Sequence, residues 1–419
     1  MSARSETAQE GLGPVRTALF ALMPFGLGYF FSYLFRAVNA VVSPDLVSEL
    51  GLRASDLGLL TAAYLFAFSI CQLPLGILLD RYGPRRVQFC LLLIAAAGAV
   101  AFASSSTAFG LTIARAVIGL GVAGGLMAGF KAVVMWVPPE RRALANSFVM
   151  SMGAIGLLVA TQPTEWAVRL YGWRNVFLVL AAATAVVACI IFVTVPEKKN
   201  SLGSDTLRNS LRAVGQIYSD RQFWLIVPLL CTTAGTHIAI QTLWAAPWLR
   251  DIAGLDREGV AGVLFWMAAS FFVGILVSGT IADWLGRRGV HNLDVMIGFI
   301  VAFIVSQALI VFDVVPLRFI AWLVFGMTGQ VAILAYPWLS THFGAALAGR
   351  SNTAVNLLLF MTAFLVQYAI GYIIDLFPRS AGGGYAKDAY VAAFGFFLAL
   401  QVASLLLYLS VRRRYFVTS

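Results

Sequence analysis

The sequence predicts an all-α membrane protein in which twelve transmembrane helices form two six-helix bundles related by pseudo-symmetry. Of the 419 residues, 60% are hydrophobic and only 11% are charged, which is too apolar for a soluble domain. Apolar runs of about 20 residues, the length that spans a bilayer, recur along the whole chain. One charged loop also occurs twice, once in each half. The apolar runs and the duplication together predict this fold.

Each half of the chain is predicted to form one bundle, residues 17–195 and residues 223–410. The polar segment 196–222, which opens Pro-Glu-Lys-Lys-Asn-Ser, is predicted to be the linker between them. The N-terminal tail, 1–16, lacks the apolar core of a cleaved signal peptide, so the first helix is expected to stay in place, and 411–419 forms the second tail. The twelve helices are expected at 17–42, 56–78, 88–104, 109–136, 143–168, 174–195, 223–248, 259–283, 294–312, 316–340, 351–376 and 388–410.

Lys and Arg residues are distributed unevenly between the two sides of the predicted membrane. Eighteen lie on the side of the termini and eight on the opposite side, with three inside helices. By the positive-inside rule both termini and the linker are cytoplasmic, and we expect a multi-pass protein of a bacterial inner membrane. The net charge of +10 follows largely from this asymmetry, and such scattered basic residues do not favour nucleic-acid binding.

The four cysteines, Cys71, Cys90, Cys189 and Cys231, all fall within predicted helices. None has the CxxC spacing of a thiolate metal site. We therefore expect no disulfide framework, no metal site and no cofactor.

The repeated loop reads Gly76-Ile-Leu-Leu-Asp80-Arg81-Tyr-Gly83-Pro-Arg85-Arg86. It returns 203 positions later as Gly279-Thr-Ile-Ala-Asp283-Trp-Leu-Gly286-Arg287-Arg288, with the Gly, Asp, Gly and basic pair at the same spacing. This pattern resembles the signature loop between the second and third helices of the major facilitator superfamily of transporters. Further similarities are Arg115-Ala-Val-Ile-Gly119-Leu-Gly121 and Gly172-Trp173-Arg174, whereas the Gly-Pro-x-x-Gly-Gly pattern of drug/proton antiporters is missing from the fifth helix.

The resemblance implies a secondary transporter whose two halves alternate between two open states. In this family the loop is thought to stabilise the state closed to the cytoplasm, with Gly76 allowing close helix approach. The alternative is that the loop residues only anchor helix ends at the headgroups. The second copy has Trp284 in place of Arg81, so we expect it to be the weaker latch. Our candidates for the conformational switch are Gly76, Asp80, Arg81, Gly83, Arg85, Arg86, Lys131, Gly279, Asp283, Arg287 and Arg288.

Three basic residues, Arg36, Arg115 and Lys131, are predicted at membrane depth, where a charge is costly unless it faces a cavity or a partner. Arg36 and Arg115 each lie about 9 Å below the outer edge of their helices. The resemblance places both helices around a central cavity, and a guanidinium group there suits a carboxylate. The alternatives are snorkelling and an ion pair between Arg115 and Glu165. For Lys131 a substrate or gate role and snorkelling stay equally open, because it lies about 160° around the helix from Arg115.

Uncharged polar residues supply the other candidates for substrate binding. His237, Gln241 and Trp244 share one stripe of the seventh helix with Thr233 and Trp248. For each amide, an interhelical hydrogen bond is as good an explanation as contact with a ligand. Glu165 and His237 are the candidates for a coupling proton. The full substrate-binding set is Arg36, Asn39, Tyr64, Arg115, His237, Gln241, Trp244, Gln330, Asn356 and Gln367.

These residues predict a monomeric transporter that imports a small organic anion, with flat or aromatic carboxylates as one class, by proton symport. Anion:cation symporters of the superfamily typically carry a Glu seven residues after the fourth-helix Arg, and here that position is Val122, so coupling by that residue is excluded. An alternative is a carrier of a neutral metabolite or vitamin, with Arg115 paired to Glu165. Another is a transporter-like membrane sensor of solutes. No set of nucleophile, base and orienting group predicts an enzyme.

Overall fold

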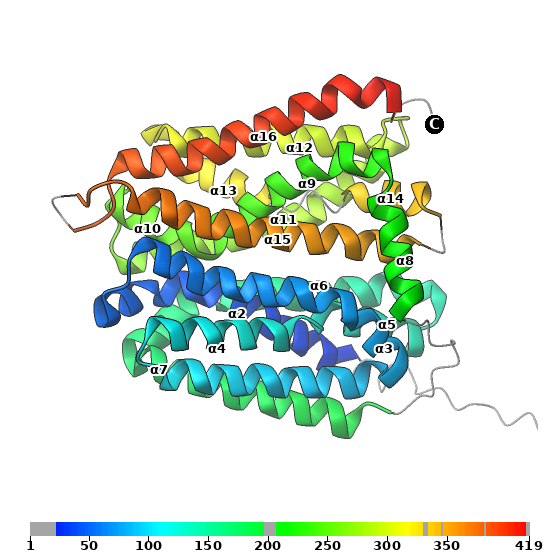
Figure 1. Ribbon diagram of the computed structural model, residues 1–419, viewed down its shortest axis with the longest axis horizontal. Helices are drawn as coiled ribbons and strands as arrows, with labels where there is room; N and C mark the ends of the chain where they lie inside the picture. Colours follow the sequence, from blue (N-terminus) through cyan, green and yellow to red (C-terminus); the bar gives the residue numbers. More distant parts are fainter. Residues whose placement is uncertain (1–21, 197–206, 330–333, 345–346, 381–382, 416–419) are drawn as a thin grey trace, which may run out of the picture.

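The chain folds into a bundle of helices that run along the long axis of the molecule (Figure 1). The computed structural model describes residues 22–196, 207–329, 334–344, 347–380 and 383–415, and no strand occurs in these ranges. Ten helical segments of the described chain are long and apolar enough to cross a membrane. Two shorter apolar helices, Leu144–Val159 and Val315–Thr328, overlap the predicted fifth and tenth helices.

The N-terminal half forms the lower layer of Figure 1 and the C-terminal half the upper layer. The first contains α2 (Met23–Leu50), α3 (Ala54–Ser104), α4 (Ala108–Val122), α5 (Gly125–Trp136), a 3₁₀ turn (Pro139–Arg141), α6 (Arg142–Val159) and α7 (Gln162–Thr194). The second contains α9 (Arg221–Ala239), the π-helix η3 (Ile240–Trp244), α10 (Ala245–Asp251), α11 (Arg257–Gly286), α12 (Asn292–Val311), η4 (Val315–Leu317), α13 (Arg318–Thr328), α14 (Tyr336–His342), α15 (Ala348–Asp375) and α16 (Lys387–Tyr415).

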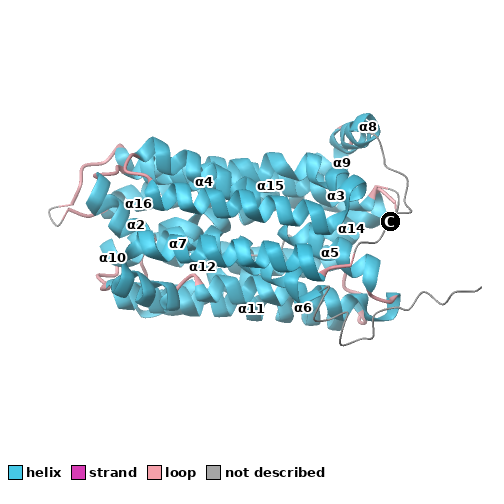
Figure 2. Ribbon diagram, turned by 90° about the horizontal axis from the view of Figure 1, so that it is seen from below, coloured by secondary structure: helices cyan, strands magenta, loops and turns pink. Residues whose placement is uncertain are grey.

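The predicted linker contains a helix, α8 (Leu207–Tyr218), which lies across one end of the bundle (Figures 1 and 2). We call this end, where α16 also finishes, the linker end. The opposite end, where α2, α10 and α15 finish, is the far end. The Tyr218 hydroxyl donates to the carbonyl oxygen of Ala354 at 3.2 Å, so α8 is joined to the C-terminal half.

Several predicted helices are merged or broken in the structure. Two helices merge into α3 across Gly83 (φ 75°) and two into α7 across Gly172 (φ 77°), where the left-handed backbone strongly favours glycine. In the second copy of the repeated loop it is Gly289 (φ 84°), not Gly286, that has a positive φ. The predicted fifth helix is interrupted at Ala160 and Thr161, between α6 and α7. The positions of the turns between helices therefore depend more on local backbone conformation than on the length of the apolar runs.

The internal repeat is also visible in the packing of glycines against backbone. A Cβ atom at Gly119 on α4 would lie 2.2 Å from the carbonyl oxygen of Tyr64 on α3. In the other half, a Cβ atom at Gly326 on α13 would lie 2.5 Å from the carbonyl oxygen of Met267 on α11. Tyr64 and Met267 are separated by 203 positions, the spacing of the two charged loops. Both halves thus use the same close contact between equivalent helices.

The two halves meet closely where α3 crosses α15 at the far end. A Cβ atom at Gly58 would lie 3.0 Å from the carbonyl oxygen of Gln367, and one at Gly371 would lie 2.5 Å from that of Ala54. The carboxylate of Asp375 accepts hydrogen bonds from the backbone amides of Ala54 (3.1 Å) and Ser55 (2.8 Å). An acid from one half therefore caps a helix N-terminus of the other, where the helix dipole favours negative charge.

Candidate functional site

Arg36 lies on α2 inside a cage of aromatic rings. Its guanidinium carbon is 4.5 Å from the ring centroid of Tyr33, 5.1 Å from that of Phe68 and 5.0 Å from that of Phe360. Phe360 belongs to α15, so both halves contribute to the cage. The side chain is almost wholly buried, and its Nε has no hydrogen-bond partner in the described chain. The rings stabilise the cation without neutralising it.

Arg115 lies on α4 and is completely buried. Its Nη1 donates to the carbonyl oxygen of Phe35 at 2.8 Å, while Nε and Nη2 have no partner among the described residues. Its guanidinium carbon is 4.8 Å from the ring centroid of Tyr64, whose hydroxyl donates to the Ser32 carbonyl oxygen at 2.9 Å and also interacts with Arg36. Both guanidinium groups therefore interact with the same tyrosine.

Neither arginine forms an ion pair in the part of the chain that the structure describes. The expected alternative, a pair between Arg115 and Glu165, is wrong, because the Glu165 carboxylate lies 2.6 Å from Nε of Arg257. Buried cations without a counter-ion are costly to keep, which makes them candidates for binding an anion.

The C-terminal half presents a tyrosine and an amide towards the same region. The Tyr336 hydroxyl donates to Oδ1 of Asn356 at 2.7 Å. Tyr336 also interacts electrostatically with Tyr29 and Tyr33 of α2, so it lies near the seam between the halves. The sequence analysis missed Tyr336. The available signal was the Tyr-Pro pair at the start of α14, where the predicted tenth helix is broken.

Two more predicted residues have unused polar atoms near the seam. Nδ2 of Asn39 donates to the Thr61 hydroxyl at 2.8 Å, and its Oδ1 is buried without a partner in the described chain. Gln241, on η3, borders a small cavity whose other walls come from α2, α6, the turn after α6 and α11, and its Nε2 also lacks a described partner. Both amides can still bond to a ligand.

The polar atoms of His237, Trp244 and Gln367 are arranged differently. His237 is enclosed by the rings of Phe271, Phe303 and Phe325, with centroids 5.2 to 6.0 Å from its own, so it packs inside the C-terminal half. Nε1 of Trp244 donates to the Gln367 carbonyl oxygen at 3.1 Å, an interhelical bond between η3 and α15. Trp244 and Gln367 thus pack at the seam, beside Gly58 of α3, and no contact of these three residues with Arg36 or Arg115 occurs in the described chain. Gln330 lies outside the described residues.

The residues of the first charged loop interact within the N-terminal half. Nζ of Lys131 lies 2.7 Å from Oδ1 of Asp80. The Lys131 side chain therefore extends towards the linker end of the bundle and not towards Arg115. Arg81 lies over the ring of Tyr82, and Arg85 over that of Phe192. In the second loop, Arg288 lies 3.7 Å from the ring centroid of Trp284.

The close helix approach expected at Gly76 is not present in this conformation. A Cβ atom there, or at Gly279, would meet no atom within 4 Å. The structure therefore gives these two glycines no packing role in the state observed.

Replacing Lys131 by Gln removes the charge that pairs with Asp80. Because Asp80 is 45% exposed, we expect a loss of about 1 kcal/mol or less in stability. Stabilisation of the protein by organic anions should be unchanged, since Lys131 points away from the two arginines. Thermal unfolding with and without anion measures both effects, and loss of the anion response in this variant would place Lys131 in the binding site instead.

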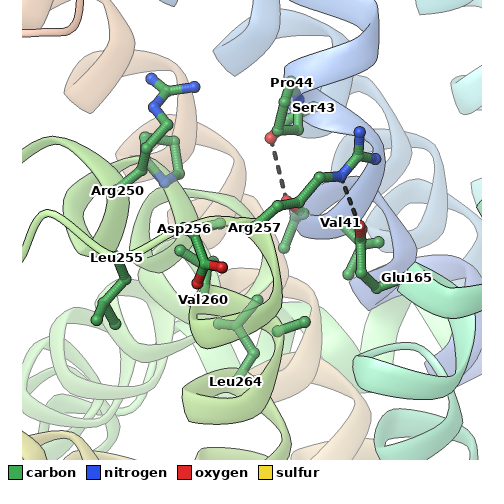
Figure 3. Close-up of a pocket in the computed structure, with 14 residues that line it drawn as sticks. Val41, Ser43, Pro44, Glu165, Arg250, Leu255, Asp256, Arg257, Val260 and Leu264 are labelled. Carbon is green, nitrogen blue, oxygen red and sulfur yellow. Dashed lines mark hydrogen bonds and ion pairs between the residues drawn. The ribbon is translucent and has the colours of Figure 1, made fainter. Parts of the chain in front are cut away.

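A cluster of charges joins the halves at the far end. Nη1 of Arg257, on α11, donates to Oδ1 of Asp45 on α2 at 2.9 Å, Nη2 bonds the second oxygen, and Nε pairs with Glu165 on α7. Figure 3 shows Arg257 reaching Glu165 in the wall of a cavity of about 230 Å³. We name these three residues, together with Asp375, the far-end lock. The sequence analysis placed Glu165 at this depth but missed Arg257, Asp45 and Asp375.

Comparisons with known proteins assign the fold and the family. The hexuronate transporter of Escherichia coli is 28% identical over 64% of this chain and 66% of its own length, so the match spans just under two thirds of that relative. The probable galactarate/D-glucarate transporter of Bacillus subtilis is 26% identical over 90% of this chain and 88% of its own. Among solved structures, a bacterial homologue of the human lysosomal transporter Spinster shares the fold, with a TM-score of 0.70, 18% identity and 97% of each chain covered.

The family model described as Major Facilitator Superfamily matches residues 25–366, which is most of the chain. Its relatives and its fold are those of membrane transporters and not of enzymes. The structure, the repeated loop and these matches agree: the chain belongs to the major facilitator superfamily.

Proposed function

We propose that this protein is a secondary transporter that carries small organic anions by alternating access. The observation that carries the proposal is the pair of buried guanidinium groups, Arg36 and Arg115, which have no carboxylate partner in the described chain. The names of the two relatives, transporters of hexuronate and of galactarate or D-glucarate, agree with an anion. The neutral-substrate alternative depended on pairing Arg115 with Glu165, and Glu165 is paired with Arg257.

The substrate site of this proposal lies between the halves. Arg36 and Arg115 hold the acidic groups through charge-assisted hydrogen bonds, and Asn39, Tyr64, Gln241, Asn356 and Tyr336 offer neutral ones. Aromatic rings around Arg36 can also contact a flat carboxylate. Asp80 with Lys131 at one end and the far-end lock at the other are the proposed gates.

The proposal includes a monomer of twelve membrane-spanning helices with both termini in the cytoplasm. The merged helix α3 crosses twice. In α7 the residues before Gly172 complete the crossing begun by α6, and the residues after it form the next crossing; the short helix α13 contributes the remaining crossing, which the length criterion alone does not count. The far end is then external. Single cysteines placed in the loop after Leu376 and in α8 should react with a membrane-impermeant reagent from opposite sides.

Replacing Arg36 by Ala should weaken anion binding at least tenfold, because a charge-assisted hydrogen bond contributes about 1.5–3 kcal/mol. The measurement is thermal stabilisation of purified protein by a panel of sugar acids, aromatic carboxylates and neutral sugars. The matched control is Arg53→Ala, whose side chain is 71% exposed and pairs only locally with Asp56. Stabilisation by neutral compounds only, unaffected by Arg36→Ala, would contradict the proposal.

We further propose that uptake is coupled to protons. Glu165 is the better candidate for the coupling group, since it pairs with Arg257 across the seam, whereas His237 is enclosed by phenylalanine rings. Uptake into proteoliposomes with and without an inward pH gradient tests coupling. If substrate accumulates equally with and without the pH gradient, in protein that still exchanges substrate, the carrier is not coupled to protons.

A further inference from the structure

The central site holds two positive charges and, in the described chain, no negative one. The sequence itself contains no Asp or Glu in 11–44, 81–139 or 314–374, which cover most of the helices that surround Arg36 and Arg115. Several acids elsewhere in the described chain form ion pairs near the two ends of the bundle. Ion pairs there join Asp80 to Lys131, Glu49 to Arg174, Asp251 to Arg250, Asp294 to Arg412 and Asp313 to Arg318.

Groups that do contact the two arginines compensate their charge only in part. Arg36 has the rings of Tyr33, Phe68 and Phe360, and Arg115 has the Tyr64 ring and one backbone carbonyl oxygen. Rings and carbonyl dipoles attract a cation but carry no opposite charge. A bound ligand with a single negative charge would leave one buried guanidinium uncompensated.

The unused hydrogen-bond donors are divided between the two side chains. Nε of Arg36 and both Nε and Nη2 of Arg115 lack partners among the described residues. Arg115 lies over the Tyr64 ring and Arg36 interacts with the same residue, so two separate sets of free donors, on α2 and α4, meet at one tyrosine. Two acidic groups at the two ends of one small molecule match this arrangement better than one.

We propose, on the basis of the function proposed above, that the preferred substrate is a dianion with an acidic group at each end, such as a dicarboxylate or a carboxylate–sulfonate. One guanidinium group binds each acidic group, so the occupied site is electrically neutral. The relatives do not decide the charge of the substrate. One is named as a transporter of hexuronate, a monocarboxylate, and the other as a probable transporter of galactarate and D-glucarate, which are dicarboxylates.

The test uses three compounds that share six carbons and the same hydroxyl stereochemistry: galactarate (two charges), galactonate (one) and galactitol (none). Binding to the full-length protein in detergent is measured by calorimetry at constant ionic strength. We expect galactarate to bind at least tenfold more tightly than galactonate, and galactitol not to bind. Succinate against butyrate repeats the comparison with a four-carbon chain.

Removing one charge should remove the preference for two. In Arg115→Gln, and independently in Arg36→Gln, the ratio of galactarate to galactonate affinity should fall to nearly one, with galactarate losing more. Two variants are used because a change at the fully buried Arg115 can prevent folding. A uniform loss for both anions would show a general structural role instead.

The outcomes separate this inference from the proposed function. Equal binding of the one-charge and two-charge compounds by the wild-type protein, abolished by Arg36→Ala, would overturn the dianion while keeping an anion transporter. Binding of galactitol alone, or of none of the anions, would overturn both.

Discussion

Replacing Gly119 by valine is expected to prevent folding of the N-terminal half, or to leave a protein that binds no anion. A Cβ atom at this position would lie 2.2 Å from the carbonyl oxygen of Tyr64 and 2.9 Å from its Cα. Backbone cannot move aside as a flexible side chain can, so α4 must separate from α3. Overpacking of a close contact costs about 1–3 kcal/mol or more, and a contact with backbone lies at the upper end.

The separation would also disturb the candidate site, because both arginines interact with Tyr64 and Arg115 is only one turn from Gly119. The measurements are the yield of monodisperse protein, its thermal midpoint and its stabilisation by anions. Gly298→Val is the matched control, since this glycine is also in a helix but a Cβ atom there would meet nothing within 4 Å. A Gly119→Val protein with the thermal midpoint and anion response of the control would contradict the close contact between α3 and α4.

Replacing Arg257 by Gln is expected to open the far end of the transporter. Arg257 is the cation between Asp45 and Glu165, and without it two carboxylates face each other across the seam between the halves. Glu165 is only 5% exposed, so its charge would be left in a poorly solvated place. Because Arg257 itself is 36% exposed, we expect a shift of roughly 1–2 kcal/mol towards the open state, about tenfold in population.

The opening can be followed with a cysteine at Ser43, which is 3% exposed and lines the cavity beside the lock. With the four native cysteines replaced by alanine, its reaction with a membrane-impermeant thiol reagent should become about tenfold faster in Arg257→Gln. The matched control is Arg169→Gln, which breaks an exposed pair with Glu258 on the same two helices. Unchanged reactivity in Arg257→Gln, or an equal increase in the control, would show that the far-end lock does not hold this state closed.

The family and the all-helical fold could be predicted because they depend on features that a single sequence displays. Apolar length identifies helices, and the loops at Gly76 and Gly279 reveal the duplication. The positions of helix breaks could not be predicted in the same way. The break at Ala160 and Thr161 falls inside a segment that apolar length assigns to one helix, although Pro163 is a local signal for it. The π-helix Ile240–Trp244 has no signature that separates it from ordinary helix.

The candidate site was predictable only where charge at membrane depth marks it. Arg36 and Arg115 stand out because an unpaired cation there needs a reason. The stripe from His237 to Trp244 was less informative. Helical spacing shows that these residues share a face, but it does not show whether that face packs at the seam between the halves or inside one half. The partners of Glu165 were missed because Asp45 and Arg257 lie near helix ends, where charged residues are common. The sequence around such a residue does not show which distant charge it pairs with.

The cap that Asp375 places on α3 has a consequence for how this contact can change during evolution. Its partners are backbone amides of Ala54 and Ser55, which nearly every residue type supplies. The cap therefore makes no demand on the side chains at 54 and 55 beyond excluding proline, which has no N–H, whereas it requires the acid at Asp375. In an alignment of related sequences, this contact between Asp375 and α3 would therefore be visible as a conserved acid at position 375 without a covarying partner position.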